Sequence, residues 1–471
     1  MLLFIKEKKK KIFAFSIYDH RECSPIALKS QKYYNPPKNI PRLYMQPQET
    51  RLLPHKKTVI ASSLAIILEW YDFSIFGFYA VVLSEIFFPF TDETTAILST
   101  FMIFALSFLF RPLGSVVISS LGDRFGRKNA FLFTVILMTF PTVLIGLLPG
   151  YEKIGIAATV LLIVLRIAQA LSVGGERSAT LSLLAEIAPP RLRGLYGSMS
   201  LFSTTAGILL ASFVCGLVST ALDHDELTGW GWRIPFLLGA VSGLTAYSLR
   251  KTVRESAMFL DLKKSGKTSR NPVRESLTGH WKPVLIILAA TIMFAVSFYL
   301  IFVYIPTFAT RYGGMSLAQI LNINTMNLAL CTMLVPLSGY FSDRVGRKPA
   351  IIIGCAGEVV MGFLLFKVFA GNDLTLKIIV QFAAGLMNVI FAGAFAAYMV
   401  ESFPTRVRMS GISMGNVIGF SIFGGSAPLI ASYLIDRTGD VTAPGIYLAA
   451  ASAVSLIAVL FAKETYRTEL R

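Results

Sequence analysis

The chain alternates between long apolar runs and short polar segments. About twenty helical residues cross the hydrocarbon core of a bilayer, and backbone polar groups in lipid must find their partners within the protein. The pattern therefore predicts transmembrane helices rather than the ten-residue alternation of a membrane barrel. We expect twelve spans, near residues 58–86, 96–120, 130–149, 155–187, 195–220, 233–250, 282–309, 317–341, 349–370, 375–400, 409–434 and 444–462.

The polar segments differ in charge between the two sides of these spans. Segments after even-numbered spans contain the bases Arg124, Arg127, Lys128, Arg191, Arg193, Arg344, Arg347, Lys348, Arg406 and Arg408. The opposite segments contain the acids Asp92, Glu93, Asp223, Asp225, Glu226 and Asp373. Because Lys and Arg concentrate in cytoplasmic loops, both termini and the basic segment 251–281, which divides the spans six and six, are predicted to be cytoplasmic.

Composition agrees with a membrane protein, since 54% of the 471 residues are hydrophobic and only 15% are charged. The net charge of +17 is compatible with nucleic-acid binding, but positively charged cytoplasmic loops explain it without a nucleic acid partner. The four cysteines have no framework spacing and three lie in apolar runs, so neither a disulfide scaffold nor a metal site is expected.

Residues 1–55 differ from the rest of the chain. They contain the basic run Lys8–Lys11 and the pair Pro36–Pro37, without an amphipathic period. We expect a disordered cytoplasmic tail attracted to anionic lipid, and no cleaved signal peptide. Met45 begins a segment that would make a natural start, so a native protein without residues 1–44 is a further hypothesis.

Two short motifs occur twice in the same order. Gly122-Asp123-Arg124-Phe125-Gly126-Arg127-Lys128 returns as Ser342-Asp343-Arg344-Val345-Gly346-Arg347-Lys348, and the segment from Glu186 to Gly194 resembles that from Glu401 to Arg408. Repetition at half the chain length indicates duplication. We predict six-helix bundles at 56–250 and 282–465, a cytoplasmic linker at 251–281 and a short cytoplasmic tail at 466–471.

With these motifs, residues 56–465 resemble the major facilitator superfamily. Its loop pattern, Gly-x-Leu-x-Asp-Arg-x-Gly-Arg-Lys, fits Gly339–Lys348 except at Phe341, and the first copy has Ser119 in place of the first glycine. Arg166-Ile167-Ala168-Gln169-Ala170 is similar to the family's Arg-x-x-Gln-Gly. The resemblance implies an all-α membrane fold of twelve transmembrane helices in two pseudo-symmetric six-helix bundles.

Within the superfamily the chain is most similar to metabolite:proton symporters, the group of proline/betaine, α-ketoglutarate, shikimate and citrate carriers. The similarity lies in Glu69-Trp70-Tyr71-Asp72-Phe73, Arg111-Pro112-Leu113-Gly114 and Val173-Gly174-Gly175-Glu176. Arg177 departs from it, because many relatives have an aromatic residue there. The sequence continues only briefly after the last span, so osmosensing through the coiled-coil tail of some osmolyte carriers is not expected.

Ionisable groups within apolar spans are costly and are candidates for function. Glu69 and Asp72 are spaced i,i+3, so they share a face of the first span and are candidates for proton coupling. Arg166 in the fourth span could pair with Asp72, and the resemblance favours this pair because related sugar carriers couple protons through such an acid and arginine. A permanent structural ion pair remains the alternative.

Other polar residues are candidates for substrate binding. Arg111 could hold a carboxylate in two-point contact, as the resemblance to organic-acid carriers implies, or could snorkel toward the membrane face. Arg177 could face substrate or neutralise a neighbour. Tyr299, Asn327 and Asn388 could line a cavity or join helices. Glu358 and Lys367 are expected on a peripheral span without a coupling role.

The repeated motifs predict a cytoplasmic gate of ion pairs. The resemblance implies that the gate residues hold one state closed and separate in the other. The candidates are Asp123, Arg124, Arg127, Asp343, Arg344, Arg347, Glu186 and Glu401.

These observations predict a secondary active transporter, with proton-coupled symport of a small carboxylate or zwitterion by alternating access. No phosphate-binding loop is present, so the energy would come from a gradient, and neither enzyme activity nor a cofactor is expected. We expect a monomer in the bacterial inner membrane, with substrate, protons and lipid as partners. A facilitator or exporter is the nearest alternative, and a non-transporting sensor or scaffold is a more distant one.

Overall fold

The computed structural model describes residues 52–89, 92–114, 127–172, 181, 184, 188–189, 191–250, 272–404 and 407–468. The first motif copy up to Gly126, the tail 1–51 and the candidates Arg177 and Glu186 lie outside these ranges. Residues 53–471 form one compact unit by their contacts, and all that follows concerns that unit. Within the described ranges, every regular element is a helix.

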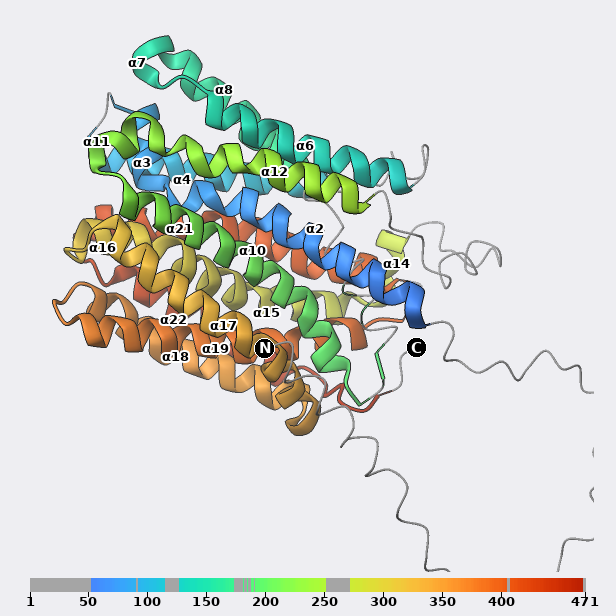
Figure 1. Ribbon diagram of the computed structural model, residues 1–471. Helices are drawn as coiled ribbons and strands as arrows, with labels where there is room; N and C mark the ends of the chain where they lie inside the picture. Colours follow the sequence, from blue (N-terminus) through green and yellow to red (C-terminus); the bar gives the residue numbers. More distant parts are fainter. Residues whose placement is uncertain are drawn as a thin grey trace, which may run out of the picture. The chain divides into compact units, whose positions relative to one another are not determined.

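The helices of the first half run alongside one another for much of their length (Figure 1). They are α2 (Leu52–Phe78), α3 (Ala80–Phe87), α4 (Glu93–Leu109), α6 (Arg127–Leu147), α7 (Tyr151–Ile154), α8 (Ile156–Ser172), α10 (Arg193–Ala221), α11 (His224–Glu226), the π-helix η3 (Leu227–Gly231) and α12 (Arg233–Arg250).

The second half contains more irregular helices. They are α14 (Pro272–Gly279), α15 (Trp281–Tyr299), the π-helix η4 (Leu300–Tyr304), α16 (Ile305–Tyr312), α17 (Leu317–Val345), α18 (Arg347–Phe369), α19 (Leu374–Glu401), α20 (Arg408–Ile412), the π-helices η5 (Ser413–Val417) and η6 (Phe420–Gly424), α21 (Gly425–Thr438) and α22 (Ala443–Leu460). A π turn breaks the regular backbone ladder within a span.

The helices confirm the prediction of an all-α membrane protein. Eight helices among the described residues are long and apolar enough to cross a bilayer, and a ninth span is the pair α2–α3, bent by 62°. Shorter apolar helices cover Phe133–Leu147 and Ile156–Ser172. Each of the twelve predicted spans overlaps a helix. Large apolar side chains such as Phe140, Leu244 and Met333 are 62%, 70% and 71% exposed, as expected for a surface facing lipid.

Polar residues in the short loops set the helix ends. Ser316 and Gln319 form a reciprocal capping box at the start of α17, and Asp373 accepts the backbone N–H of Leu376 at the start of α19. Asp92 caps α4 in the same way, and hydrogen bonds from Thr95 hold the pKa of Asp92 below its usual range. The polar residues between apolar runs thus define the spans locally.

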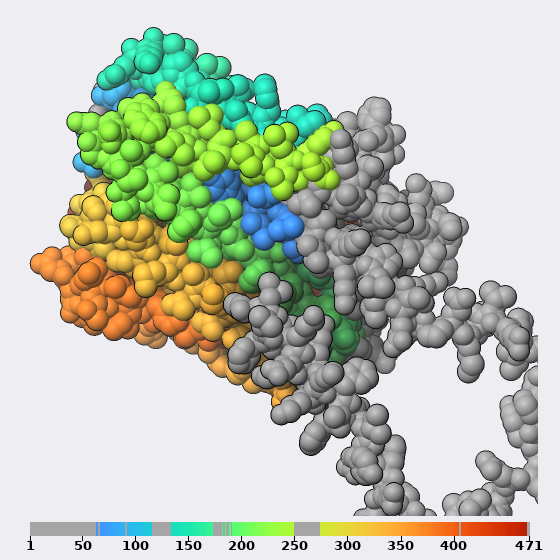
Figure 2. All heavy atoms as spheres, viewed as in Figure 1, coloured from blue at the N-terminus to red at the C-terminus, as the bar shows by residue number. Residues whose placement is uncertain are grey.

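The two halves of the sequence pack through two long helix pairs, α10 against α17 and α4 against α21. In the space-filling view, the first-half helices α6 and α12 lie on one side of α10 and the second-half helices α17 and α18 on the other (Figure 2). Glycine permits the closest approach, because a Cβ on Gly339 would lie 2.4 Å from the carbonyl oxygen of Gly194.

Candidate functional site

A small cavity lies between the two halves. The first half supplies Trp70 from α2 and, from α10, Leu201, Thr204 and Thr205. The remaining lining comes from the second half and includes four aromatic rings, namely Phe294 and Phe298 on α15, Phe302 on η4 and Phe420 on η6. A smaller hollow also contacts Trp70 and Phe298, and is lined by Phe73, Phe104 and Tyr299 as well.

Amide side chains stabilise the π-helix that brings Phe302 to the cavity. Widening a helical turn leaves backbone carbonyls without their regular donors. Asn324 Nδ2 donates to the carbonyl of Phe302 at 2.9 Å, and Gln381 Nε2 donates to Asn324 Oδ1 at 3.0 Å and to the carbonyl of Ile301 at 3.4 Å. Polar residues on α17 and α19 therefore fix the position of this aromatic wall.

Arg111, one turn beyond α4, lies buried among aromatic rings. Its guanidinium carbon is 3.7 Å from the ring centre of Phe108, 4.2 Å from that of Phe73 and 5.7 Å from that of Trp70. The side chain is 5% exposed, and Nε and Nη2 have no hydrogen-bond partner among the described residues. Ring faces attract the cation but do not satisfy these N–H donors, so they remain available to an anion.

Arg166 on α8 approaches the same ring. Its guanidinium carbon lies 4.7 Å from the centre of Phe73 and 4.3 Å from that of Phe76, and the side chain is fully buried. Nη1 donates to Gln169 Oε1 at 2.8 Å, whereas Nε and Nη2 find no partner in the described part of the chain. Two buried cations therefore share Phe73, and each has two N–H-bearing atoms without an acceptor.

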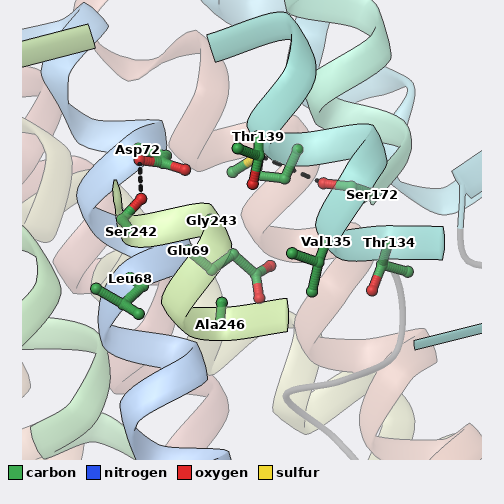
Figure 3. A pocket seen from close by; sticks show the side chains of 11 residues that line it. Leu68, Glu69, Asp72, Thr134, Val135, Thr139, Ser172, Ser242, Gly243 and Ala246 are labelled. Carbon is green, nitrogen blue, oxygen red and sulfur yellow. Dashed lines mark hydrogen bonds between the residues drawn. The ribbon is translucent and has the colours of Figure 1, made fainter. Parts of the chain in front are cut away.

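Asp72 and Glu69 face a separate small pocket among α2, α6, α8 and α12 (Figure 3). Asp72 is buried, and its Oδ1 accepts a hydrogen bond from Ser242 Oγ at 2.9 Å. Hydroxyl groups complete the polar lining, from Thr134, Thr139 and Ser172. Burial favours the protonated form of such an acid, and hydroxyl donors favour its carboxylate form.

The structure does not pair Asp72 with Arg166, so that sequence-based expectation is corrected for this state. Successive helical residues point about 100° apart. Asp72 accordingly turns toward Ser242 of α12, while Phe73, the next residue, turns toward the two arginines. The acids and the bases of the first half thus lie on different faces of α2.

The second motif copy forms an ion-paired cluster where α17 meets α18, here called the motif end. Arg347 is 1% exposed; its Nη1 lies 2.9 Å from Asp343 Oδ1 and its Nη2 lies 3.0 Å from Glu401 Oε1. Gly346 between the two helices has φ +112°, which explains the motif's glycine. Of the predicted gate residues, these three come together, whereas Arg344 is exposed and bonds to the Tyr340 hydroxyl.

This cluster also joins the two halves. Asp343 Oδ1 and Oδ2 accept the backbone N–H groups of Gly194 and Leu195 at 2.8 and 2.9 Å, at the start of α10. A carboxylate at a helix N-terminus is stabilised both by these donors and by the helix dipole. The second-half motif therefore binds the first half directly.

The last described residues reinforce the motif end. Glu464 accepts the backbone N–H groups of Arg347 and Lys348 at 3.1 and 3.0 Å, so it caps α18. Arg193 Nη1 donates to the carbonyl of Thr468 at 2.6 Å. The predicted C-terminal tail therefore begins in contact with the start of α10.

The opposite end of the helices is closed by a second contact between halves. Arg311 Nε lies 3.0 Å from Glu93 Oε1, and Arg311 Nη2 donates to Thr94 Oγ1 at 3.0 Å. Between the ends, Ser212 Oγ and Thr325 Oγ1 lie 2.8 Å apart across α10 and α17. The halves thus touch near both ends of the helices and between them.

The other sequence candidates take different places. Asn388 lines the larger cavity and Tyr299 the smaller hollow. Asn327 instead donates to the carbonyl of Gln381 at 3.2 Å and lines neither space. Arg177, Glu186, Asp123 and Arg124 lie outside the described residues, and of Arg127 only the backbone is described.

Sequence reasoning missed Glu358. Glu358 was expected on a peripheral span, but its side chain is fully buried and accepts a hydrogen bond from Ser297 Oγ at 2.6 Å. Other residues of α18, such as Val360 and Phe363, are 54% and 58% exposed. The rule that buried ionisable groups in a membrane default to function would have identified Glu358.

Comparisons with known proteins agree with this architecture. Residues 57–277 match the family described as Sugar (and other) transporter, and residues 287–471 match the Major Facilitator Superfamily. The xylose transporter XylE from E. coli, in a partially occluded inward-open conformation, aligns with a TM-score of 0.69 at 18% identity, covering 87% of this chain and 98% of XylE. This similarity confirms the predicted twelve-helix fold.

Sequence relatives cover nearly the same span. The glycine betaine/proline/ectoine/pipecolic acid transporter OusA of Dickeya dadantii is 31% identical over 425 residues, which is 88% of this chain and 85% of OusA. The proline/betaine transporter of Salmonella typhimurium is 31% identical over 429 residues, with the same coverage of both chains. These families and relatives are transporters rather than enzymes. The chain therefore belongs to the major facilitator superfamily of multi-pass membrane transporters.

Proposed function

We propose that this protein takes up a small zwitterionic carboxylate, of the glycine betaine or proline type, together with protons. The observation that carries the proposal is the pair of buried guanidinium groups, on Arg111 and Arg166, beside an aromatic-lined cavity. Both relatives described above are named as transporters of proline and betaine.

The two ends of such a substrate suit the two kinds of surface. A carboxylate would accept the N–H groups of Arg111 and Arg166 that have no other acceptor, in charge-assisted bonds. A quaternary or secondary ammonium would lie against Trp70, Phe298 and Phe420, since ring faces attract cations. Asn388 would supply a polar contact at this end. Arg177 stays a predicted substrate residue.

Transport would proceed by alternating access, with residues 56–250 and 282–465 moving as two bodies about the cavity. The cluster of Asp343, Arg347 and Glu401 would open on one side, and the Arg311–Glu93 pair on the other. We place the motif end in the cytoplasm because the basic loops lie there. The membrane would be the bacterial inner membrane and the protein a monomer.

Protons would bind at Asp72 and Glu69. Their pocket is separate from the central cavity, so the proton and the substrate need not compete for one group. Asp72 lies one residue from Phe73, on which both arginines stack, so a charge change on Asp72 would alter the field at the substrate carboxylate.

Uptake by purified protein in liposomes tests the proposal. With an inward proton gradient imposed, we expect labelled glycine betaine or proline to accumulate above its external concentration, and collapse of the gradient to abolish accumulation. Equilibration without accumulation would instead indicate a facilitator. Absence of substrate-dependent flux for both compounds and for a panel of organic acids would contradict transport of this class.

A further inference from the structure

Glu358 is a second buried carboxyl group, in the half of the chain opposite Asp72. It lies near the middle of α18 and is fully buried. Its Oε1 accepts the hydroxyl of Ser297 on α15 at 2.6 Å, and its Oε2 has no hydrogen-bond partner in the described ranges. No sequence motif of the family marked this residue.

Among the described residues, no cation compensates the charge that an ionised Glu358 would carry. The titratable groups that face it are the thiols of Cys331 on α17 and Cys355 on its own helix. From α15 it meets Ser297, and no charged group on the described parts of α16, α19 or α22 acts on it. The amine of Lys377 on α19 is held elsewhere, by the carbonyl of Gly313 at 2.7 Å.

An ionised carboxylate is poorly supported in such a place. Burial removes the water that stabilises the charge, and a single hydroxyl donor replaces only part of that stabilisation. A proton on Oε2 removes the charge without requiring any rearrangement of the Ser297 contact. These surroundings therefore favour the neutral carboxylic acid form of Glu358.

A short chain of hydrogen bonds connects this acid to the cavity. Asn388 Nδ2 donates to Ser297 Oγ at 3.1 Å, and Ser297 in turn donates to Glu358. Asn388 lines the central cavity, as does Phe298, the neighbour of Ser297 on α15. A change of charge on Glu358 would thus reach a residue that faces the substrate through two hydrogen bonds.

We propose that Glu358 is a second proton-binding site, coupled to the substrate cavity through Ser297 and Asn388. The inference rests on the proposed proton-coupled uptake and adds a site in the second half. The proton enters from water when one side of the cavity is open, resides on Oε2 while both sides are closed, and leaves to water on the other side. Loss of that proton leaves a carboxylate that pulls the Ser297 hydroxyl toward itself and alters the orientation of the Asn388 amide.

Two measurements on the purified full-length chain test this site. The first is infrared spectroscopy, comparing the wild type with Glu358→Gln. We expect the wild type to show the C=O band of a protonated carboxylic acid that the variant lacks. The variant Asp440→Asn, an exposed acid changed to an amide in the same half, should keep the band. If Glu358→Gln removes carboxylate bands instead, the residue is ionised and the proposal is wrong.

The second measurement is glycine betaine affinity as a function of pH. A proton taken up with substrate makes affinity fall by up to about tenfold per pH unit above the pKa of the site. We expect the affinity of Glu358→Gln to fall less steeply with rising pH than that of the wild type, with the remaining dependence due to Asp72 and Glu69. Glu358→Asp should restore the steeper dependence, and Ser297→Ala should weaken it. An unchanged profile in Glu358→Gln would show that the buried acid is only structural.

The two hypotheses can fail separately. If the wild type never accumulates substrate under a proton gradient, the proposed proton coupling is wrong. The infrared band would then still decide whether Glu358 carries a proton, and a flat affinity profile in the wild type would exclude its coupling to the cavity. If the wild type accumulates substrate and Glu358→Gln does so with the same pH profile, only the inference about Glu358 falls.

Discussion

The two halves of the chain present different surfaces to one cavity. The first half lines it with Trp70, Leu201, Thr204 and Thr205. Beside Trp70, Arg111 and Arg166 stack on Phe73, with N–H groups that have no acceptor among the described residues. The second half contributes rings and amides, among them Phe420 and Asn388. The two halves therefore differ in the chemistry that they place at and beside the cavity.

This difference suggests a division of labour in recognition. A substrate with opposite charges at its two ends would bind in one orientation, with its anion against the first half and its cation against the second. Each half also contains one buried acid bonded to a single serine hydroxyl, Asp72 to Ser242 and Glu358 to Ser297. The halves thus differ in the groups proposed to bind substrate but resemble each other in the acids proposed to bind protons.

The largest effect should come from removing a cation of the first half. Arg111→Gln should weaken substrate binding by roughly 30-fold or more, because truncating one partner of a buried charged pair costs about 2–5 kcal/mol. Calorimetric titration of glycine betaine measures the change. The matched control is Arg344→Gln, which alters an exposed arginine of the motif. Binding within twofold of wild type in Arg111→Gln would remove this residue from the site.

The next prediction tests whether the acids of the first half serve proton coupling while its arginines serve substrate binding. Asp72→Asn should abolish accumulation of substrate against its gradient, since the amide cannot exchange a proton. Exchange of internal for external substrate should persist, because the carboxylate site is on a different face of α2. Glu152→Gln, at an exposed position, serves as the control. Proton-driven accumulation that survives in Asp72→Asn would show that coupling resides elsewhere.

A third test concerns the contact between the halves. In Gly339→Ala the new Cβ would lie 2.4 Å from the carbonyl oxygen of Gly194, so α10 and α17 cannot close at the motif end without moving. We expect a thiol placed at the buried Ser198 to react with a water-soluble reagent several-fold faster in this background. Gly279→Ala is the control, because nothing lies within 4 Å of the position that its new Cβ would take. Equal reaction rates would mean that this glycine contact does not hold the end closed.

The smallest effect should come from the aromatic wall of the second half. Phe420→Leu removes a ring face from the cavity, and a cation–π contact contributes about 0.5–2 kcal/mol. Glycine betaine affinity should therefore fall by roughly 2- to 30-fold in equilibrium binding, with little change for ligands that lack an ammonium group. Phe461→Leu, at a ring that is 80% exposed, provides the comparison. An equal loss for neutral ligands would indicate simple packing instead.

Much of the fold was predictable because hydropathy and loop charge are local properties. All twelve spans overlap helices, and the second motif copy places Asp343, Arg347 and Glu401 together as expected. The 62° bend between α2 and α3 and the three π-helices of the second half were not predicted. Tertiary hydrogen bonds such as Asn324 to the Phe302 carbonyl stabilise η4, and no sequence period reveals them.

For the candidate site, the sequence predicted which charged residues are buried better than it predicted which of them form pairs. Arg111, Asp72 and Arg166 are buried, as the cost of charge in apolar spans implies. The expected Asp72–Arg166 pair was wrong because the rotation of α2 and α8 about their axes depends on packing. Likewise, the rotation of α18 about its axis turns Glu358 into the interior while neighbouring side chains face outward. The spacing between Glu358 and Lys367 in the sequence could not indicate this rotation.

The most direct test of the division of labour compares two ligands on one protein. Choline shares the quaternary ammonium of glycine betaine but lacks its carboxylate. If the first half holds the carboxylate, the wild type should bind glycine betaine roughly 30-fold or more tightly than choline, and Arg111→Gln should bind the two about equally. Equal binding of both ligands by the wild type, or an undiminished preference in Arg111→Gln, would contradict it.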